Sequence, residues 1–118
     1  MVFTEKDIIK KLKGFRKLNE RIDLIEFKLN HEDYENDDQK KQLETDLRQS
    51  KLDVAKLERY IHSIDPKCAS VLQAVYIFKL TYAEISDQET ITEYAAHKRR
   101  RKGVKELTAV YNHAETLK

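Results

Sequence analysis

Basic side chains gather in one short segment near the C-terminus. Residues 98–105, KRRRKGVK, carry six Lys or Arg side chains and no acid, although the net charge of the whole chain is only +2. Positive side chains clustered on one element neutralise the phosphates of a nucleic acid. Tyr94 and His97, just before the cluster, and Lys98 at its start offer hydrogen-bond donors and flat rings to base edges. The segment therefore indicates an anionic partner, and double-stranded DNA is our leading hypothesis.

The other chemically active residues match no catalytic or metal-binding motif. No pair among the four histidines and Cys68 has zinc-ligand spacing. Residues 32–38 are acidic, but they lack the alternating ligands and the Gly of a calcium loop. The chain has no glycine-rich phosphate loop and no recognisable nucleophile–base motif. We therefore expect no enzyme activity, no catalytic residue, no metal and no cofactor.

Helix signals precede the basic segment. Thr81 and Glu84 have the spacing of a capping box, which predicts a short helix over 82–87. A turn over 88–91 follows, and Thr92 is an N-cap for a helix over 93–111 that carries the basic cluster. This order, a short capped helix, a turn and a capped basic helix, is the helix-turn-helix plan.

An earlier helix completes the predicted C-terminal domain. Asp65 is a candidate cap and Pro66 suits the first helical position, which predicts a helix over 66–78. Its apolar residues surround much of the helix, so we expect it to be central to the core. Small or apolar residues at the steps expected to face inward are Ala83, Ile85, Ile91, Ala96, Gly103 and Leu107.

A basic run also occurs on solvated helix faces and in targeting segments. The capped helix and turn before it favour a docking role, because they hold the run in a fixed geometry. On this interpretation the phosphate contacts are made by Lys98, Arg99, Arg101, Lys102 and Lys105.

The N-terminal half has the pattern of two amphipathic helices. Thr4 is a candidate cap for a first helix that begins at Glu5, and its apolar residues recur at spacings of three and four. Residues 30–38 read as the connection, with Asn30 as a C-cap and residue 36 or 37 as an N-cap, and a second helix follows over 38–63. We expect an antiparallel hairpin over 1–63, which serves as a scaffold, as a homodimer interface, or as both.

Residues 64–107, IDPKCASVLQAVYIFKLTYAEISDQETITEYAAHKRRRKGVKEL, resemble the promoter-reading C-terminal region of bacterial sigma factors. They resemble still more closely the small phage transcriptional regulators of the ArpU and RinA type. The likeness is carried by the VLQAVYI helix, the LTYAEI segment, the Ile-Thr turn, and Gly103 and Leu107. Glu89 and Thr90 stand where sigma-like turns often have Gly, and Arg100 stands at a step that is often apolar. The resemblance implies a DNA-facing segment over 92–101 and a role on late phage genes.

The residues and the resemblance together predict an all-α protein. It has an N-terminal antiparallel helical hairpin over 1–63 and a sigma-like helix-turn-helix domain over 64–118. The expected DNA-binding residues are Thr92, Glu93, Tyr94, Ala95, His97, Lys98, Arg99, Arg101, Lys102 and Lys105.

The leading functional prediction is a phage-encoded, sequence-specific regulator of transcription. One alternative is a protein-interaction module whose hairpin binds a host protein such as RNA polymerase. Another is a small terminase-like protein of phage DNA packaging. The single cysteine favours a reducing, cytoplasmic setting. We expect no signal peptide, because the N-terminal residues lack a small-residue cleavage site and are interrupted by charge. We expect no membrane partner, because no apolar run approaches the roughly 18 residues of a membrane span.

Overall fold

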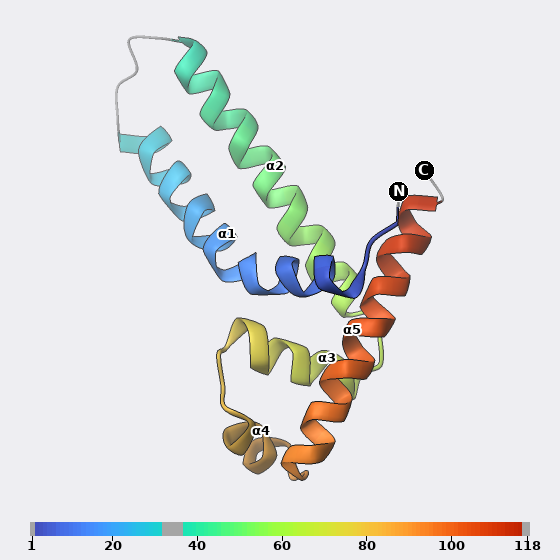
Figure 1. Cartoon of the computed structure of the whole chain (residues 1–118). Coiled ribbons are helices and arrows are strands. Elements are labelled where there is room, and N and C mark those ends of the chain that lie inside the picture. The colour runs from blue at the N-terminus through green and yellow to red at the C-terminus, as the bar shows by residue number, and fades with distance from the viewer. Residues whose placement is uncertain (1, 32–36, 117–118) are drawn as a thin grey trace. The chain divides into compact units, whose positions relative to one another are not determined.

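The computed structural model describes residues 2–31 and 37–116, and within these ranges it contains helices and no strand. The predicted all-α class is therefore confirmed for the described chain. In order along the chain the elements are α1 (Glu5–His31), α2 (Asp37–Ile61), α3 (Pro66–Leu72), the π-helix η1 (Gln73–Ile77), α4 (Tyr82–Glu89) and α5 (Glu93–Thr116) (Figure 1). No helix of the described ranges has the length and apolar character that a membrane span needs.

The predicted helix starts are nearly all confirmed, whereas the predicted ends are less accurate. The helix α1 begins at Glu5 as expected, but it continues through Asn30, so the prediction of a C-cap there is wrong. The helix α2 ends at Ile61 rather than at Ser63. Residues 32–36 of the predicted acidic connection lie outside the described residues. Helix starts are easier to predict because N-cap residues can be recognised in the sequence. These helices end without the Gly that often follows the last turn, so their ends are harder to predict.

The predicted third helix is interrupted by a change of helix type. A helix was expected over 66–78, but α3 gives way after Leu72 to the π-helix η1. Its wider turn is visible in the bond from the Phe78 N–H to the Gln73 carbonyl, five residues back, at 2.9 Å. Tyr76 is buried within this turn, and Phe78 after it is 66% exposed. The start of this helix is as predicted, with Asp65 accepting the N–H of Lys67 and Pro66 in the first position.

The described chain forms two compact units. Unit 1 comprises the chain up to Lys13 and from Arg59 onward, and unit 2 comprises Gly14–Glu58. The predicted domain boundary between residues 63 and 64 differs from this division. Within unit 1 the ring of Tyr111 on α5 contacts Tyr60 at 4.7 Å and Phe3 at 5.4 Å between centroids.

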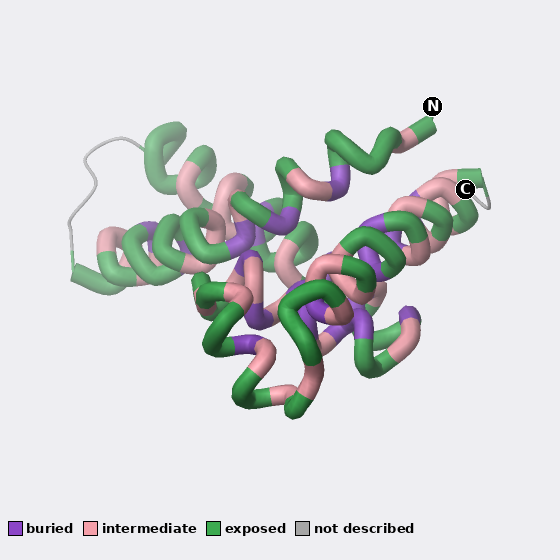
Figure 2. The backbone as a smooth tube through the Cα atoms, turned by 60° about the horizontal axis from the view of Figure 1, so that its bottom comes forward, coloured by how far each residue is buried: buried purple, intermediate pink, exposed green. Residues whose placement is uncertain are grey.

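Unit 1 is built around α5, which buries one of its faces. A buried core joins α3, η1, α4 and the first turns of α5, and it consists of Val71, Ala74, Ile85 and Ala96. Figure 2 shows exposed and buried positions interleaved along α5, as burial on one side of a helix requires. The core therefore holds the start of α5 against α4 and leaves the opposite face in solvent.

Unit 2 consists of α1 from Gly14 onward and α2 up to Glu58, which run in opposite directions side by side (Figure 1). Ion pairs link the two helices, from Arg21 to Asp46 at 3.5 Å and from Lys51 to Glu26 at 2.7 Å. The buried positions of these helices recur at helical spacings, and they include Ser50, seven residues before the buried Leu57. Large apolar side chains left in solvent on these helices are Leu24, Phe27 and Leu52, which are 54%, 59% and 58% exposed.

Candidate nucleic-acid interface

A capping box begins α4, as the sequence predicts. The Thr81 hydroxyl accepts the N–H of Glu84, and the Glu84 carboxylate accepts the N–H of Thr81, both at 3.1 Å. Two of the free N–H groups at the helix start are thereby satisfied. Ile85 is fully buried and anchors the helix in the core. Ala83 is exposed, so its predicted inward position is wrong: two residues from Ile85, it lies on nearly the opposite side of the helix.

The turn between α4 and α5 is short and tightly closed. It was predicted over 88–91, but Gln88 and Glu89 belong to α4. Thr90 ends the helix in the left-handed region, with φ 56° and ψ 48°. The backbone N–H of Thr90 bonds to the carbonyl of Ser86, and the Ser86 hydroxyl bonds to the carbonyl of Ile91. These bonds set the direction in which the chain enters α5.

The start of α5 is capped by Thr92, as predicted. The Thr92 hydroxyl accepts the N–H of Ala95 at 3.0 Å. Ala96 and Leu107 are fully buried, which confirms their predicted inward positions. Gly103 is also buried, and a Cβ added there would stand 3.0 Å from Cγ of Leu72 on α3. The absence of a side chain at Gly103 therefore allows the close approach of α5 to α3.

Four of the predicted DNA-binding residues share the exposed face of α5. Tyr94, Lys98, Arg101 and Lys105 follow one another at spacings of four, three and four residues, and all are exposed. Such spacing places them in one row along a helix. We call these four residues the outer stripe. Tyr94 at its head is 71% exposed, and Thr92 and Glu93 beside it are exposed as well.

The remaining predicted residues lie on the flanks of α5. His97 faces α4, where its ring stacks on Tyr82 at 3.6 Å between centroids and 20° between planes. Ala95, Arg99 and Lys102 lie on the other flank, next to the start of α3. The predicted set is therefore brought together on the first turns of one helix, but on three of its sides rather than on one.

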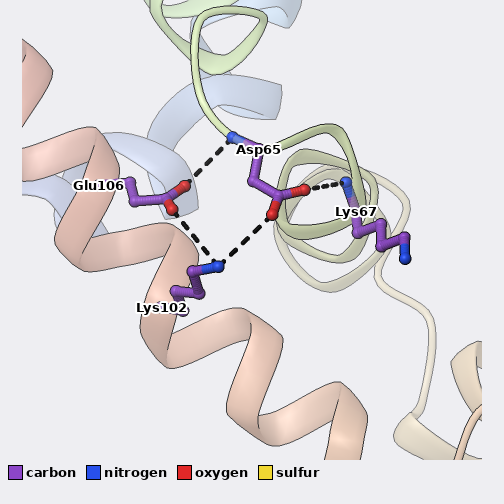
Figure 3. A network of polar contacts seen from close by, with 4 residues as sticks. All are labelled: Asp65, Lys67, Lys102 and Glu106. Carbon is purple, nitrogen blue, oxygen red and sulfur yellow. Dashed lines mark hydrogen bonds and ion pairs between the residues drawn. The ribbon is translucent and has the colours of Figure 1, made fainter.

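Lys102 takes part in a polar network that links α5 to the start of α3 (Figure 3). Its ammonium lies 3.5 Å from Asp65 Oδ2 and 3.8 Å from Glu106 Oε1. Glu106 also accepts the backbone N–H of Asp65 at 3.1 Å, and Asp65 accepts that of Lys67 at 2.9 Å. The N–H of Lys67, followed by the side chain of Lys102, holds the pKa of Asp65 below its ordinary value. Lys102 therefore has an intramolecular role beside its predicted contact with DNA.

Arg100 has a structural role that was not predicted from the sequence. Its guanidinium donates a hydrogen bond to the Tyr76 hydroxyl at 3.2 Å and so ties α5 to η1. Burial alone would lower the pKa of Arg100, but its interactions with Tyr76 and Tyr82 raise the pKa overall. Its inward position could have been predicted from the sequence, because Arg100 lies four residues after Ala96 and therefore on the same face of the helix.

The described residues contain no cluster of three or more His, Cys, Asp or Glu side chains placed to hold a metal ion. The candidate interface thus consists of an exposed basic and aromatic row on α5, a stacked histidine on one flank, and a basic flank next to α3. Comparisons with known protein families, with curated proteins and with solved structures find no match to this chain.

Proposed function

We propose that this protein binds double-stranded DNA in a sequence-specific manner, with α4 and α5 as a helix-turn-helix and α5 in the major groove. The outer stripe carries the proposal. It spans residues 94–105, or about 16 Å of helix, on a face that the fold leaves in solvent. A row of three cations headed by an aromatic ring suits a helix that lies in the groove between two phosphate backbones.

The way α5 is held supports the same function. A recognition helix can read bases only if its first turns keep one orientation relative to the rest of the domain. The capping box of α4, the left-handed Thr90 and the Thr92 cap provide that control. Buried Ala96 and the stack of His97 on Tyr82 fix the rotation of α5 about its axis.

The residues of the outer stripe have different expected roles. Tyr94 lies at the helix start, where recognition helices approach base edges, so we assign it to sequence preference. Lys98, Arg101 and Lys105 neutralise phosphates, and they make binding strongly salt-dependent. The resemblance to sigma factors and to phage regulators of the ArpU and RinA type extends the proposal to transcription of late phage genes.

Selection of bound DNA tests the proposal. The immobilised full chain is mixed with a library of random duplexes and sheared phage DNA, and the retained fragments are sequenced after several rounds. We expect one short motif to be enriched in both pools. Retention of fragments without a common motif would contradict sequence-specific recognition, and retention of none would contradict DNA binding altogether.

Unit 2 favours a second candidate function, a protein-interaction module. Leu24, Phe27 and Leu52 expose apolar surface on α1 and α2, and where such side chains form a contiguous patch they mark a protein contact. The partner would be a second copy or a host protein such as RNA polymerase. The same experiment distinguishes the candidates. A chain that retains no DNA, but retains one specific protein from a nuclease-treated host lysate, would favour this candidate over the first.

A further inference from the structure

A surface hollow lies between α5 and the start of α3, on the flank next to the outer stripe. Its volume is about 330 Å³. Asp65 and Lys67 line it from the side of α3, and Lys98, Arg99 and Lys102 line it from α5. Four basic side chains thus surround a space to which one acid contributes. Such an arrangement attracts an anion.

Three of these cations, Lys67, Lys98 and Arg99, form no ion pair within the described residues, and Lys98 belongs to the outer stripe. Within the described residues, neither the Lys67 ammonium nor the Arg99 guanidinium forms an ion pair or a side-chain hydrogen bond. Lys67 is exposed, and Arg99 is half-buried. Lys102, by contrast, lies between the carboxylates of Asp65 and Glu106. The fold therefore satisfies Lys102 and leaves Lys67 and Arg99 available to a ligand.

We infer that the hollow binds a backbone phosphate of the same DNA that the outer stripe contacts. This inference rests on the proposed function. Lys98 joins the two surfaces, because it belongs to the outer stripe and also lines the hollow. A duplex that lies along the stripe brings its backbone to this edge of α5. Its phosphate oxygens accept hydrogen bonds from Lys67 and Arg99, which extends the DNA contact from α5 to α3.

Asp65 opposes this phosphate. Its carboxylate lines the hollow and lies 3.5 Å from the Lys102 ammonium. Ion pairs between exposed side chains are weak, so a phosphate can draw Lys102 away from Asp65. Asp65 also caps α3, and Asn caps a helix as well as Asp does. The change Asp65→Asn therefore removes the opposing charge and keeps the cap.

The first test compares Lys67→Gln with Lys6→Gln on a labelled duplex over a range of salt concentrations. Lys6 is an exposed residue in the first turn of α1, within the same compact unit. We expect Lys67→Gln to weaken the Kd several-fold and to reduce the slope of log Kd against log salt by about 0.9, the value of one phosphate contact. Lys6→Gln should keep the wild-type Kd and slope. Asp65→Asn should tighten the Kd.

The second test locates the phosphate. Single phosphates of the duplex are replaced in turn by neutral methylphosphonates. At one position the replacement should weaken DNA binding by the wild-type protein, and the same replacement should cause no further loss of binding in Lys67→Gln. If Lys67→Gln keeps the wild-type salt slope and the wild-type response at every position, the inference is overturned, while the proposed function stands. A wild-type protein that binds no duplex overturns both.

Discussion

Thr90 occupies a backbone conformation that Gly adopts far more readily. Its φ of 56° lies in the left-handed region, which costs an L-residue about 1–2 kcal/mol. The side chain is β-branched, which adds to the crowding. The conformation persists because the bonds around Ser86 and Ile91 close the turn. Thr90 is therefore strained within the turn that sets the direction of α5.

Thr90→Gly should stabilise the protein by about 1 kcal/mol, because Gly enters the left-handed region without the Cβ penalty. The free energy of unfolding in urea measures the change. Thr90→Ala is the matched control, since it keeps the Cβ, and it should gain less than Thr90→Gly. A loss of stability in Thr90→Gly would show that the Thr side chain supports the turn.

Among single residues, N-caps were predicted from the sequence more accurately than left-handed residues or residues that form long-range contacts. Thr81, Thr92 and Asp65 were recognised because an N-cap is a local signal: the side chain bonds to an N–H two or three residues along. Thr90 was not recognised as a left-handed residue, because its side chain gives no sign of it. The bond of Arg100 to Tyr76 joins residues far apart in sequence, so no local pattern contains it.

Among the elements, α5 is the one that determines the site. One side packs on α3 and η1, one flank stacks on α4, and the outer stripe faces solvent. The close approach to α3 depends on Gly103. A Cβ there would lie 3.0 Å from Leu72 Cγ and 3.2 Å from Cys68 Cβ, and both neighbours are buried.

Gly103→Ala and Gly14→Ala should have opposite effects. Ala is favoured over Gly within a helix by about 1 kcal/mol. At Gly14 nothing lies within 4 Å of the added Cβ, so the full gain should appear as stability. At Gly103 crowding of a packed core costs about 1–3 kcal/mol, so a net loss is expected. Chemical denaturation of both variants tests this. Equal gains at both sites would show that α5 and α3 are less closely packed than described.

The helix pattern of the chain followed from its periodicity, but helix type did not. Apolar spacing predicted that α1 and α2 are amphipathic helices, because helical burial repeats every three to four residues. The starts of α1, α4 and α5 were predicted from the capping residues Thr4, Thr81 and Thr92. The π-helix η1 was missed. Its residues match the pattern of an α-helix equally well, and within it Tyr76 is buried while Phe78 just after it is exposed. That information lies in the packing of unit 1 rather than in the local sequence.

For the whole molecule, the positive charge that matters is local rather than total. The net charge of +2 would not attract DNA strongly, yet the outer stripe places three cations and a tyrosine on one exposed face. Unit 1 therefore presents a basic face although the chain as a whole is nearly neutral. The residues of this face were predicted from the sequence. Only the fold shows which of them lie in the outer stripe, which one stacks on Tyr82 and which line the hollow next to α3.

The most direct test of DNA binding by α5 compares two triple variants with equal loss of charge. One carries Lys98→Gln, Arg101→Gln and Lys105→Gln on the outer stripe. The control carries Lys6→Gln, Lys10→Gln and Lys13→Gln, three exposed residues of α1 in the same compact unit. The Kd for a labelled duplex is measured at several salt concentrations. We predict that the stripe variant loses most of its affinity and that its salt slope falls by about 2–3, whereas the control matches the wild type. A stripe variant that binds as tightly as the control would contradict the account.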